Sequence, residues 1–273
     1  MSALLKVNGA TRVYGIVGDP VAQTRSPEVY CTRFAEAGLN AVLVPLQVTE
    51  SNFDRVIPAL MAISNLDGLL VTAPFKSRML PFTSRLEAAA ACIGAVNALR
   101  READGSWSAD MFDGEGFARG LLAKGERLAG RRVLLFGAGG AGSAIACALA
   151  IHGVASIRIV SPDPSRTAHL VAAVSSAFPG FDIAQASSNR AGFDMIVNAS
   201  PVGMNPEDGL PGELGSLAPD TLIGDVVVAE APTAILREAI AHGCHWSNGH
   251  DMHSGQIEAI INFFVRPQTS LPS

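Results

Sequence analysis

The amino-acid sequence predicts an α/β protein of two domains, in which mostly parallel sheets are covered by helices. Short runs rich in β-branched residues alternate with helical stretches along most of the chain, and strands joined by crossover helices imply parallel pairing. Halfway along the chain, the glycine-rich segment 137–142 lies between an apolar strand and a helix. The 273 residues suffice for two domains, and we place 1–110 with 247–273 in the first and 111–246 in the second.

The composition is that of an ordinary globular protein, with 48% hydrophobic and 16% charged residues. The formal net charge of -5 gives no electrostatic case for nucleic acid or an anionic membrane surface, since both favour basic proteins. The N-terminus lacks the apolar core of a signal peptide, and no run of eighteen apolar residues is present. We therefore expect a cytoplasmic protein whose partner is a small-molecule substrate. The oligomeric state stays open, with a homodimer as one compatible assembly.

The first domain is predicted to contain three parallel strands followed by a hairpin. Its strands are expected at residues 12–18, 41–48 and 67–73, and its helices at 26–39, 51–63 and 84–94. Ser26 is expected to cap the first helix, with Pro27 at the first helical position, and Gly38 to end it in the left-handed conformation. The runs 95–101 and 106–112 are joined by the turn-forming EADG and indicate a hairpin.

The second domain is predicted to be a doubly wound unit of the Rossmann type. Asp113 is expected to cap a helix over 114–125 that leads into it. Strands are then expected at 131–136, 156–160, 194–200, 221–228 and 244–247, with helices at 141–153, 165–177 and 233–243. The final helix, over 255–265, is apolar enough to need a packing partner, and we expect it to return to the first domain.

The segment GAGGAG predicts a dinucleotide site, because it follows the strand VLLF, opens a helix and is followed by a second strand. Its glycines permit a tight turn and let the backbone approach a pyrophosphate, to which the helix N-terminus presents N–H donors. The same glycines in another context would be a simple packing turn. The residues expected to contact the cofactor here are Gly137, Ala138, Gly139, Gly140, Ala141 and Gly142.

The choice of nicotinamide depends on the end of the second strand of this domain. An NAD site usually carries an acid there, and an NADP site an arginine. Asp163 lies two residues beyond the expected position and Arg166 follows it, so either the ribose hydroxyls or a 2′-phosphate could be bound. Because Ser161-Pro162-Asp163 offers no basic group at the turn itself, NAD is the favoured cofactor and NADP the alternative.

Six motifs, in order over nearly the whole chain, resemble those of the shikimate dehydrogenase family. They are GDPVAQTRSP (18–27), VTAPFK (71–76), GAVNALR (94–100), the GAGGAG turn, NASPVGM (198–204) and GHDMHSGQ (249–256). The resemblance implies reversible hydride transfer between a nicotinamide and a ring hydroxyl of shikimate, quinate or a related polyol carboxylate. It also implies a lysine and aspartate pair at the reacting oxygen, which here are Lys76 and Asp113. Alcohol oxidation independently needs a base for the proton and a donor for the developing alkoxide.

The resemblance also assigns residues to the substrate and the cofactor. Thr24 and Ser26 match two serines that bind the substrate carboxylate, and Asn97 matches a ring-hydroxyl contact. The remaining matches are Thr72 and Gln256 for substrate, with Asn198, Met204 and Met252 beside the nicotinamide. A methionine is also a common core residue, which is the alternative for the last two.

The chain departs from the family pattern mainly around the substrate. Polar residues of the family pattern are replaced at Gln23, Tyr30, Cys31, Met111 and Phe112. In addition, Leu70 stands where the family has an asparagine, and Val228 where it has a tyrosine. Each lost hydrogen bond is worth about 0.5 to 3 kcal/mol. The departures indicate a divergent branch with changed specificity, serving quinate catabolism or an aminoshikimate-like pathway in place of aromatic amino acid biosynthesis. Two alternatives stay open: a binding-only ligand sensor, and a reductase of an unrelated carbonyl substrate.

Overall fold

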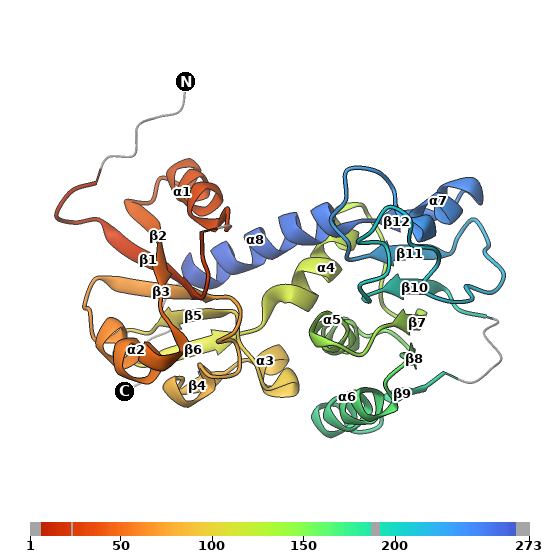
Figure 1. Ribbon diagram of the computed structural model, residues 1–273, viewed down its shortest axis with the longest axis horizontal. Helices are drawn as coiled ribbons and strands as arrows, with labels where there is room; N and C mark the ends of the chain where they lie inside the picture. Colours follow the sequence, from red (N-terminus) through yellow and green to blue (C-terminus); the bar gives the residue numbers. More distant parts are fainter. Residues whose placement is uncertain (1–6, 23, 187–191, 266–273) are drawn as a thin grey trace. The chain divides into compact units, whose positions relative to one another are not determined.

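The computed structural model describes residues 7–22, 24–186 and 192–265, so Gln23 lies outside the described residues (Figure 1). The chain divides into two compact units. Unit 1 comprises Met1–Met111 with Ile260–Ser273, and unit 2 comprises Phe112–Ala259. Within the described ranges, no helix is long and apolar enough to cross a membrane. Each unit is an α/β structure built on one six-stranded sheet.

Unit 1 has the strand order β2-β1-β3-β5-β6-β4. Its strands are β1 (Arg12–Gly18), β2 (Ala41–Gln47), β3 (Leu66–Val71), β4 (Arg85–Leu86), β5 (Ala98–Arg101) and β6 (Trp107–Asp110). Its helices are α1 (Ser26–Glu36), α2 (Phe53–Met61) and α3 (Ala88–Ile93), with short 3-10 turns at Glu50–Asn52 and Leu80–Phe82. β1 pairs in parallel with β2 and β3, and β5 pairs antiparallel with β3 and β6. The parallel start and the hairpin are therefore confirmed.

The two ends of α1 differ in how well local signals predicted them. Gly38 follows the helix with φ +69°, as expected for a left-handed residue that ends it. The expectation for Ser26 was wrong: Arg25 is the N-cap residue, and Ser26 already lies in the helix. The Ser26 hydroxyl instead accepts a hydrogen bond from Thr24 Oγ1.

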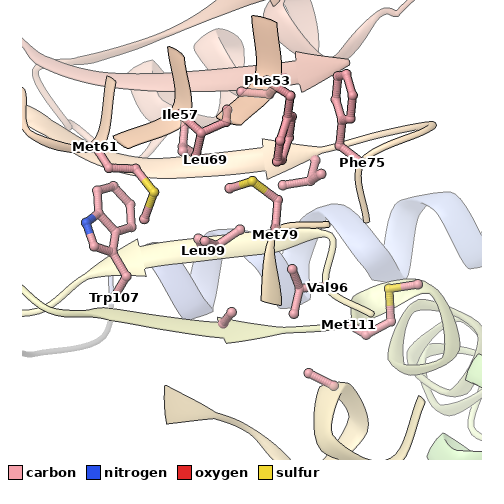
Figure 2. Packing of buried hydrophobic residues seen from close by; sticks show 14 of the residues in the cluster. Phe53, Ile57, Met61, Leu69, Phe75, Met79, Val96, Leu99, Trp107 and Met111 are labelled. Carbon is pink, nitrogen blue, oxygen red and sulfur yellow. The ribbon is translucent and has the colours of Figure 1, made fainter. Parts of the chain in front are cut away.

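The core of unit 1 fixes the segment that follows β3. Phe75 and Met79 are fully buried on either side of Lys76, against α2 and the sheet (Figure 2). The Phe75 ring lies 4.5 Å from that of Phe53, and the Arg78 guanidinium lies 4.3 Å above the Phe53 ring. Apolar burial of the flanking residues thus holds the Lys76 backbone in place.

Unit 2 has the order β12-β11-β10-β7-β8-β9, with every pair parallel. Its strands are β7 (Arg132–Phe136), β8 (Ser156–Val160), β9 (Asp182–Gln185), β10 (Met195–Asn198), β11 (Leu222–Asp225) and β12 (His245–Ser247). Its helices are α4 (Phe112–Ala123), α5 (Gly140–Ile151), α6 (Pro164–Ala177) and α7 (Ala234–Ala241). Numbered from β7, this is the 3-2-1-4-5-6 order of the Rossmann fold, with a switch point between β7 and β10.

Three local predictions for the second half of the chain were incomplete or wrong. The short strand β9 was not anticipated, because only Ile183 of its four residues is buried. Asp113 does not cap α4, since the helix begins at Phe112 and Asp113 lies in its first turn. The final helix, α8 (Gly249–Val265), begins six residues earlier than expected. The boundary between the units falls inside this helix, with Gly249–Ala259 in unit 2 and the residues from Ile260 onward in unit 1.

Candidate active site

The glycine-rich turn joins β7 to α5 at the carboxyl edge of the unit 2 sheet. Gly137 has φ +102°, and a Cβ there would lie 2.6 Å from the Ala199 carbonyl oxygen. A Cβ on Gly142 would lie 2.2 Å from the Gly137 oxygen, so the turn itself requires these two glycines. A Cβ on Gly139 or Gly140 would meet nothing within 4 Å. These two leave the backbone at the α5 N-terminus accessible, where a pyrophosphate binds in this fold. The alanines between them, Ala138 and Ala141, are buried and half-buried.

Asp163 and Arg166 lie at the N-terminus of α6, directly after β8. Asp163 Oδ1 accepts a hydrogen bond from the Arg166 backbone N–H at 3.0 Å, which makes Asp163 the helix N-cap. Its Oδ2 lies 3.2 Å from Arg166 Nε. The carboxylate is therefore engaged in capping the helix and pairing with the guanidinium. Both side chains are exposed at the strand end where an adenosine ribose is expected.

Asn198 ends β10, and its side chain is fully buried. Its Nδ2 donates to the Val202 carbonyl and to Asp225 Oδ1, both at 2.9 Å. Its Oδ1 accepts from the Ser200 N–H at 3.1 Å and from the Ser200 hydroxyl at 2.6 Å. These four bonds use the whole capacity of an amide side chain. Asn198 thus shapes the loop that follows β10, and this loop carries Met204, whose side chain is 68% exposed.

Asp225 is a buried acid that the sequence reasoning missed. It ends β11 and accepts hydrogen bonds from Asn198 Nδ2, the Val227 N–H and the Thr233 hydroxyl. Burial raises the pKa of Asp225, and these three hydrogen bonds oppose the rise. An acid at the end of an apolar parallel strand lies at the same sheet edge as Asn198, but this strand was expected to continue to residue 228, with Asp225 in its interior.

The loops after β10 and β11 enclose a pocket of about 380 Å³. Met204 lines it from the first loop, and Val228 and Thr233 line it from the second. The Val228 side chain is 62% exposed, whereas Leu70, the other apolar departure from the family pattern, is buried in β3. The two departures therefore have different surroundings: one borders open space and the other packs in a core.

Asp113 and Gln256 meet where α4 and the first part of α8 cross in unit 2. Gln256 Nε2 donates to Asp113 Oδ1 at 2.7 Å. Both side chains are half-buried, as is Met252 one turn earlier on α8. The two matched residues are separated by 143 positions in the sequence, and the fold brings them into direct contact.

The matched residues of unit 1 cluster at the adjoining ends of β3 and β5. The Val71 N–H donates to the carbonyl of Asn97, and the Val96 N–H donates to that of Lys76, at 2.9 and 3.0 Å. Asn97 is buried, and Lys76 and Thr72 are half-buried. The carbonyl of Thr72 accepts from the Phe75 N–H and closes the turn between them.

Two hydroxyl groups lie together between β1 and α1 in unit 1. Thr24 Oγ1 donates to Ser26 Oγ at 3.0 Å, and the Ser26 N–H donates back to Thr24 Oγ1 at 3.3 Å. Both residues are half-buried. Paired hydroxyls of this kind can rotate their protons toward a carboxylate.

Metal ligation has no candidate site among the described residues, where no group of three or more His, Cys, Asp or Glu side chains could hold an ion. Two histidines near the C-terminus have protein partners. His245 Nδ1 lies 2.6 Å from Glu126 Oε1, and His242 Nδ1 lies 3.0 Å from the Glu238 carbonyl.

A family model described as the shikimate dehydrogenase substrate binding domain matches residues 16–99. The chain is 35% identical over 274 residues to the shikimate dehydrogenase (NADP(+)) of Geobacter sulfurreducens, with 96% of this chain and 95% of the relative covered.

Among solved structures, the chain resembles shikimate 5-dehydrogenase from Listeria monocytogenes in complex with shikimate and NAD. The TM-score is 0.87 at 27% identity, covering 96% of this chain and 94% of that one. It also resembles the ligand-free 5-ketofructose reductase of Gluconobacter sp. strain CHM43, with a TM-score of 0.86 at 28% identity and 96% of both chains covered.

Proposed function

The chain belongs to the shikimate dehydrogenase family, and from this we propose that it transfers hydride between NAD(P) and a ring hydroxyl of shikimate, quinate or a related polyol carboxylate. The observation that carries the proposal is the placement of Lys76 beside Thr72 and Asn97 in unit 1. All three matched residues lie close together in the chain segments where β3 ends and β5 begins. We also propose that the substrate and cofactor domains correspond to units 1 and 2, so that the domains divide at 111/112 and 259/260 instead of at 110/111 and 246/247. A cytoplasmic location stays a proposal, and a homodimer stays one compatible assembly.

The chemistry assigned to Lys76 and Asp113 follows from alcohol oxidation. The bound nicotinamide supplies the hydride acceptor. As the substrate carbon loses hydride, its hydroxyl must lose a proton, and negative charge develops on the oxygen. The Asp113 carboxylate can accept a proton, and the Lys76 ammonium can stabilise the alkoxide. Burial of Phe75 and Met79 holds the Lys76 backbone in place for this role.

Recognition of the substrate carboxylate is assigned to Thr24 and Ser26. Their hydroxyls already lie 3.0 Å apart, so one carboxylate can accept a hydrogen bond from each. Val228 supplies no polar group where the family carries a tyrosine. We therefore propose that shikimate binds more weakly than a ligand with additional apolar or bulky substituents.

For the cofactor, we propose NAD with NADP as the alternative. Support for NAD comes from Asp163, whose carboxylate holds Arg166 by an ion pair and so reduces the charge available for a 2′-phosphate. Relatives use both cofactors by name, since one is an NADP(+) enzyme and one was solved with NAD. The ratio of kcat/KM for the two cofactors measures this preference directly.

A second candidate function is the reduction of a keto sugar that lacks a carboxylate. It is favoured by the likeness to 5-ketofructose reductase and by Val228, an apolar residue that lines the pocket in unit 2. A substrate without a carboxylate would not form the hydrogen bond that the family's tyrosine, replaced here by Val228, donates to a carboxylate.

The test is a matrix of initial rates for shikimate, quinate, aminoshikimate and 5-ketofructose with NAD(H) and NADP(H). Turnover of a cyclic carboxylate supports the first proposal, and turnover of 5-ketofructose alone supports the second. Binding without turnover would show a ligand sensor. Lys76→Ala should reduce kcat by 10²-fold or more, on the order expected for loss of an acid–base group, while cofactor affinity stays unchanged. An active Lys76→Ala variant would contradict the assigned chemistry.

A further inference from the structure

Glycines allow α4 and the N-terminal part of α8 to cross at unusually short range. A Cβ on Gly116 would lie 2.6 Å from Gln256 Cβ and 2.7 Å from the Met252 carbonyl oxygen. A Cβ on Gly255 would lie 2.4 Å from the Gly116 carbonyl oxygen, and one on Gly120 would lie 2.8 Å from that of Asp251. The backbones thus approach more closely than any side chain at these positions would permit.

Polar contacts fix the position of α8 on α4 one turn away from this crossing. Lys124 Nζ lies 2.5 Å from Asp251 Oδ2 and 4.7 Å from the centre of the Trp246 ring. The Ser247 hydroxyl and the Asn248 N–H donate to the same Asp251 oxygen. The rotation of α8 about its axis is therefore constrained, and with it the direction in which Gln256 points.

We propose that Gln256 is a positioning residue that orients the Asp113 carboxylate for proton transfer. This rests on the proposed function, in which Asp113 belongs to the reacting pair. The amide donates to Oδ1 at 2.7 Å, and it keeps its proton at every working pH. A hydrogen bond to the charged form favours the carboxylate, and the short helix crossing holds the donor in reach. The role is additional to the substrate contact that family resemblance implies for Gln256.

The hydrogen bond between Gln256 and Asp113 lies where the chain enters and leaves unit 2. Asp113 is the second residue of unit 2, and Gln256 lies three residues before Ala259, where α8 passes back to unit 1. The bond thus ties together the two segments through which the chain enters and leaves unit 2. Asp113 is oriented by the element that continues into unit 1, and not only by its own helix.

The test uses Gln256→Met, which keeps the length and helix propensity of the side chain and removes the donor. We expect kcat and kcat/KM both to fall about tenfold or more, because Asp113 loses the donor that orients it. Gln256→Glu should lower both further, since two carboxylates then meet. Glu258→Met, exposed on the same helix, is the matched control and should change neither quantity.

Two outcomes would overturn the proposal in distinguishable ways. A raised KM in Gln256→Met, with kcat unchanged, would restrict Gln256 to substrate binding. Full activity of Asp113→Asn would instead remove Asp113 from the chemistry and so contradict the proposed function. Should Gln256→Met lose cofactor binding, Gln256→Asn supplies the second variant: it keeps the amide but is one methylene shorter, so it should not reach Asp113 and should reproduce the loss of kcat.

Discussion

Asn198 donates a hydrogen bond of 2.9 Å to the Asp225 carboxylate at a site where both side chains are fully buried. The bond joins the ends of β10 and β11, the neighbouring parallel strands whose loops carry Met204 and Val228. A buried carboxylate is tolerated only when it is hydrogen-bonded, so the pair sets the shape of both loops together.

We predict that Asn198→Ala lowers the free energy of unfolding by about 2 to 3 kcal/mol, because Asp225 loses a donor to a buried charge. The folded pKa of Asp225 is already raised by burial, so the penalty grows as pH rises through it and shrinks as pH falls. Urea unfolding at pH 4, near the ordinary pKa of an aspartate, and at pH 8 measures the difference. Ser200→Ala removes a hydroxyl that donates to Asn198 and accepts from the Val202 N–H but does not contact Asp225, and it should cost about 1 kcal/mol with little pH dependence. Equal losses at both pH values in Asn198→Ala would contradict this account.

Two glycines of the same turn should respond in opposite ways to alanine. Gly139→Ala should leave the thermal midpoint nearly unchanged, since its Cβ enters open space, and should weaken cofactor binding at least tenfold. Gly142→Ala should lower stability by several kcal/mol, because its Cβ would lie 2.2 Å from a backbone oxygen. Calorimetry and cofactor titration separate the two effects. Normal cofactor affinity in Gly139→Ala would show that the pyrophosphate binds elsewhere.

The elements that depend on local sequence were predictable, and contacts between distant segments were not. The turn 137–142 was predictable because its steric demands act within a few residues. The position of Gly38 was predictable because a helix often ends at a residue in the left-handed conformation, which glycine adopts easily. The bond between Asp113 and Gln256 joins positions 143 residues apart and depends on how α4 meets α8. No local pattern encodes a crossing of that kind.

The wrong predictions have a common physical cause. Ser26 and Asp113 are both good helix caps by residue type, yet the helices begin earlier and leave these side chains to other partners. Ser26 accepts from Thr24, and Asp113 accepts from Gln256. In each case the polar group is used at the candidate site, where side-chain partners outweigh capping propensity.

Asp163→Asn should shift the cofactor preference toward NADP. Asparagine caps a helix as well as aspartate does, so α6 is retained while Arg166 loses its charged partner. We expect the ratio of kcat/KM for NADP over NAD to rise about tenfold, a change of about 1.4 kcal/mol. Asp163→Ala, which loses the cap as well, should also lower stability by about 1 kcal/mol. An unchanged ratio in both variants would show that these side chains do not reach the ribose.

Asp194 should stabilise the protein in a pH-dependent manner. Hydrogen bonds from Arg132 lower the pKa of Asp194 to about 2. A lowered folded pKa means that the stabilisation is present above the unfolded value, near 4, and is lost as pH falls toward 2. Because the pair is partly exposed, Asp194→Asn should cost only about 1 kcal/mol at pH 7. Urea midpoints of the two proteins should converge as the pH falls from about 4 to about 2, and a constant gap would refute the assignment.

Restoring the two family residues that this chain lacks should give contrasting results. Val228 is exposed beside the pocket, so Val228→Tyr adds a hydroxyl without disturbing a core. Because the hydroxyl can form one added hydrogen bond, the substitution should lower KM for a carboxylate substrate about three- to tenfold. Leu70 is buried in β3, so Leu70→Asn places an amide in an apolar environment and should cost about 1 to 3 kcal/mol of stability. Steady-state kinetics with shikimate and thermal unfolding measure the two effects. If Val228→Tyr leaves KM for every carboxylate substrate unchanged, the substrate of this branch carries no carboxylate near that loop, and the keto-sugar candidate gains accordingly.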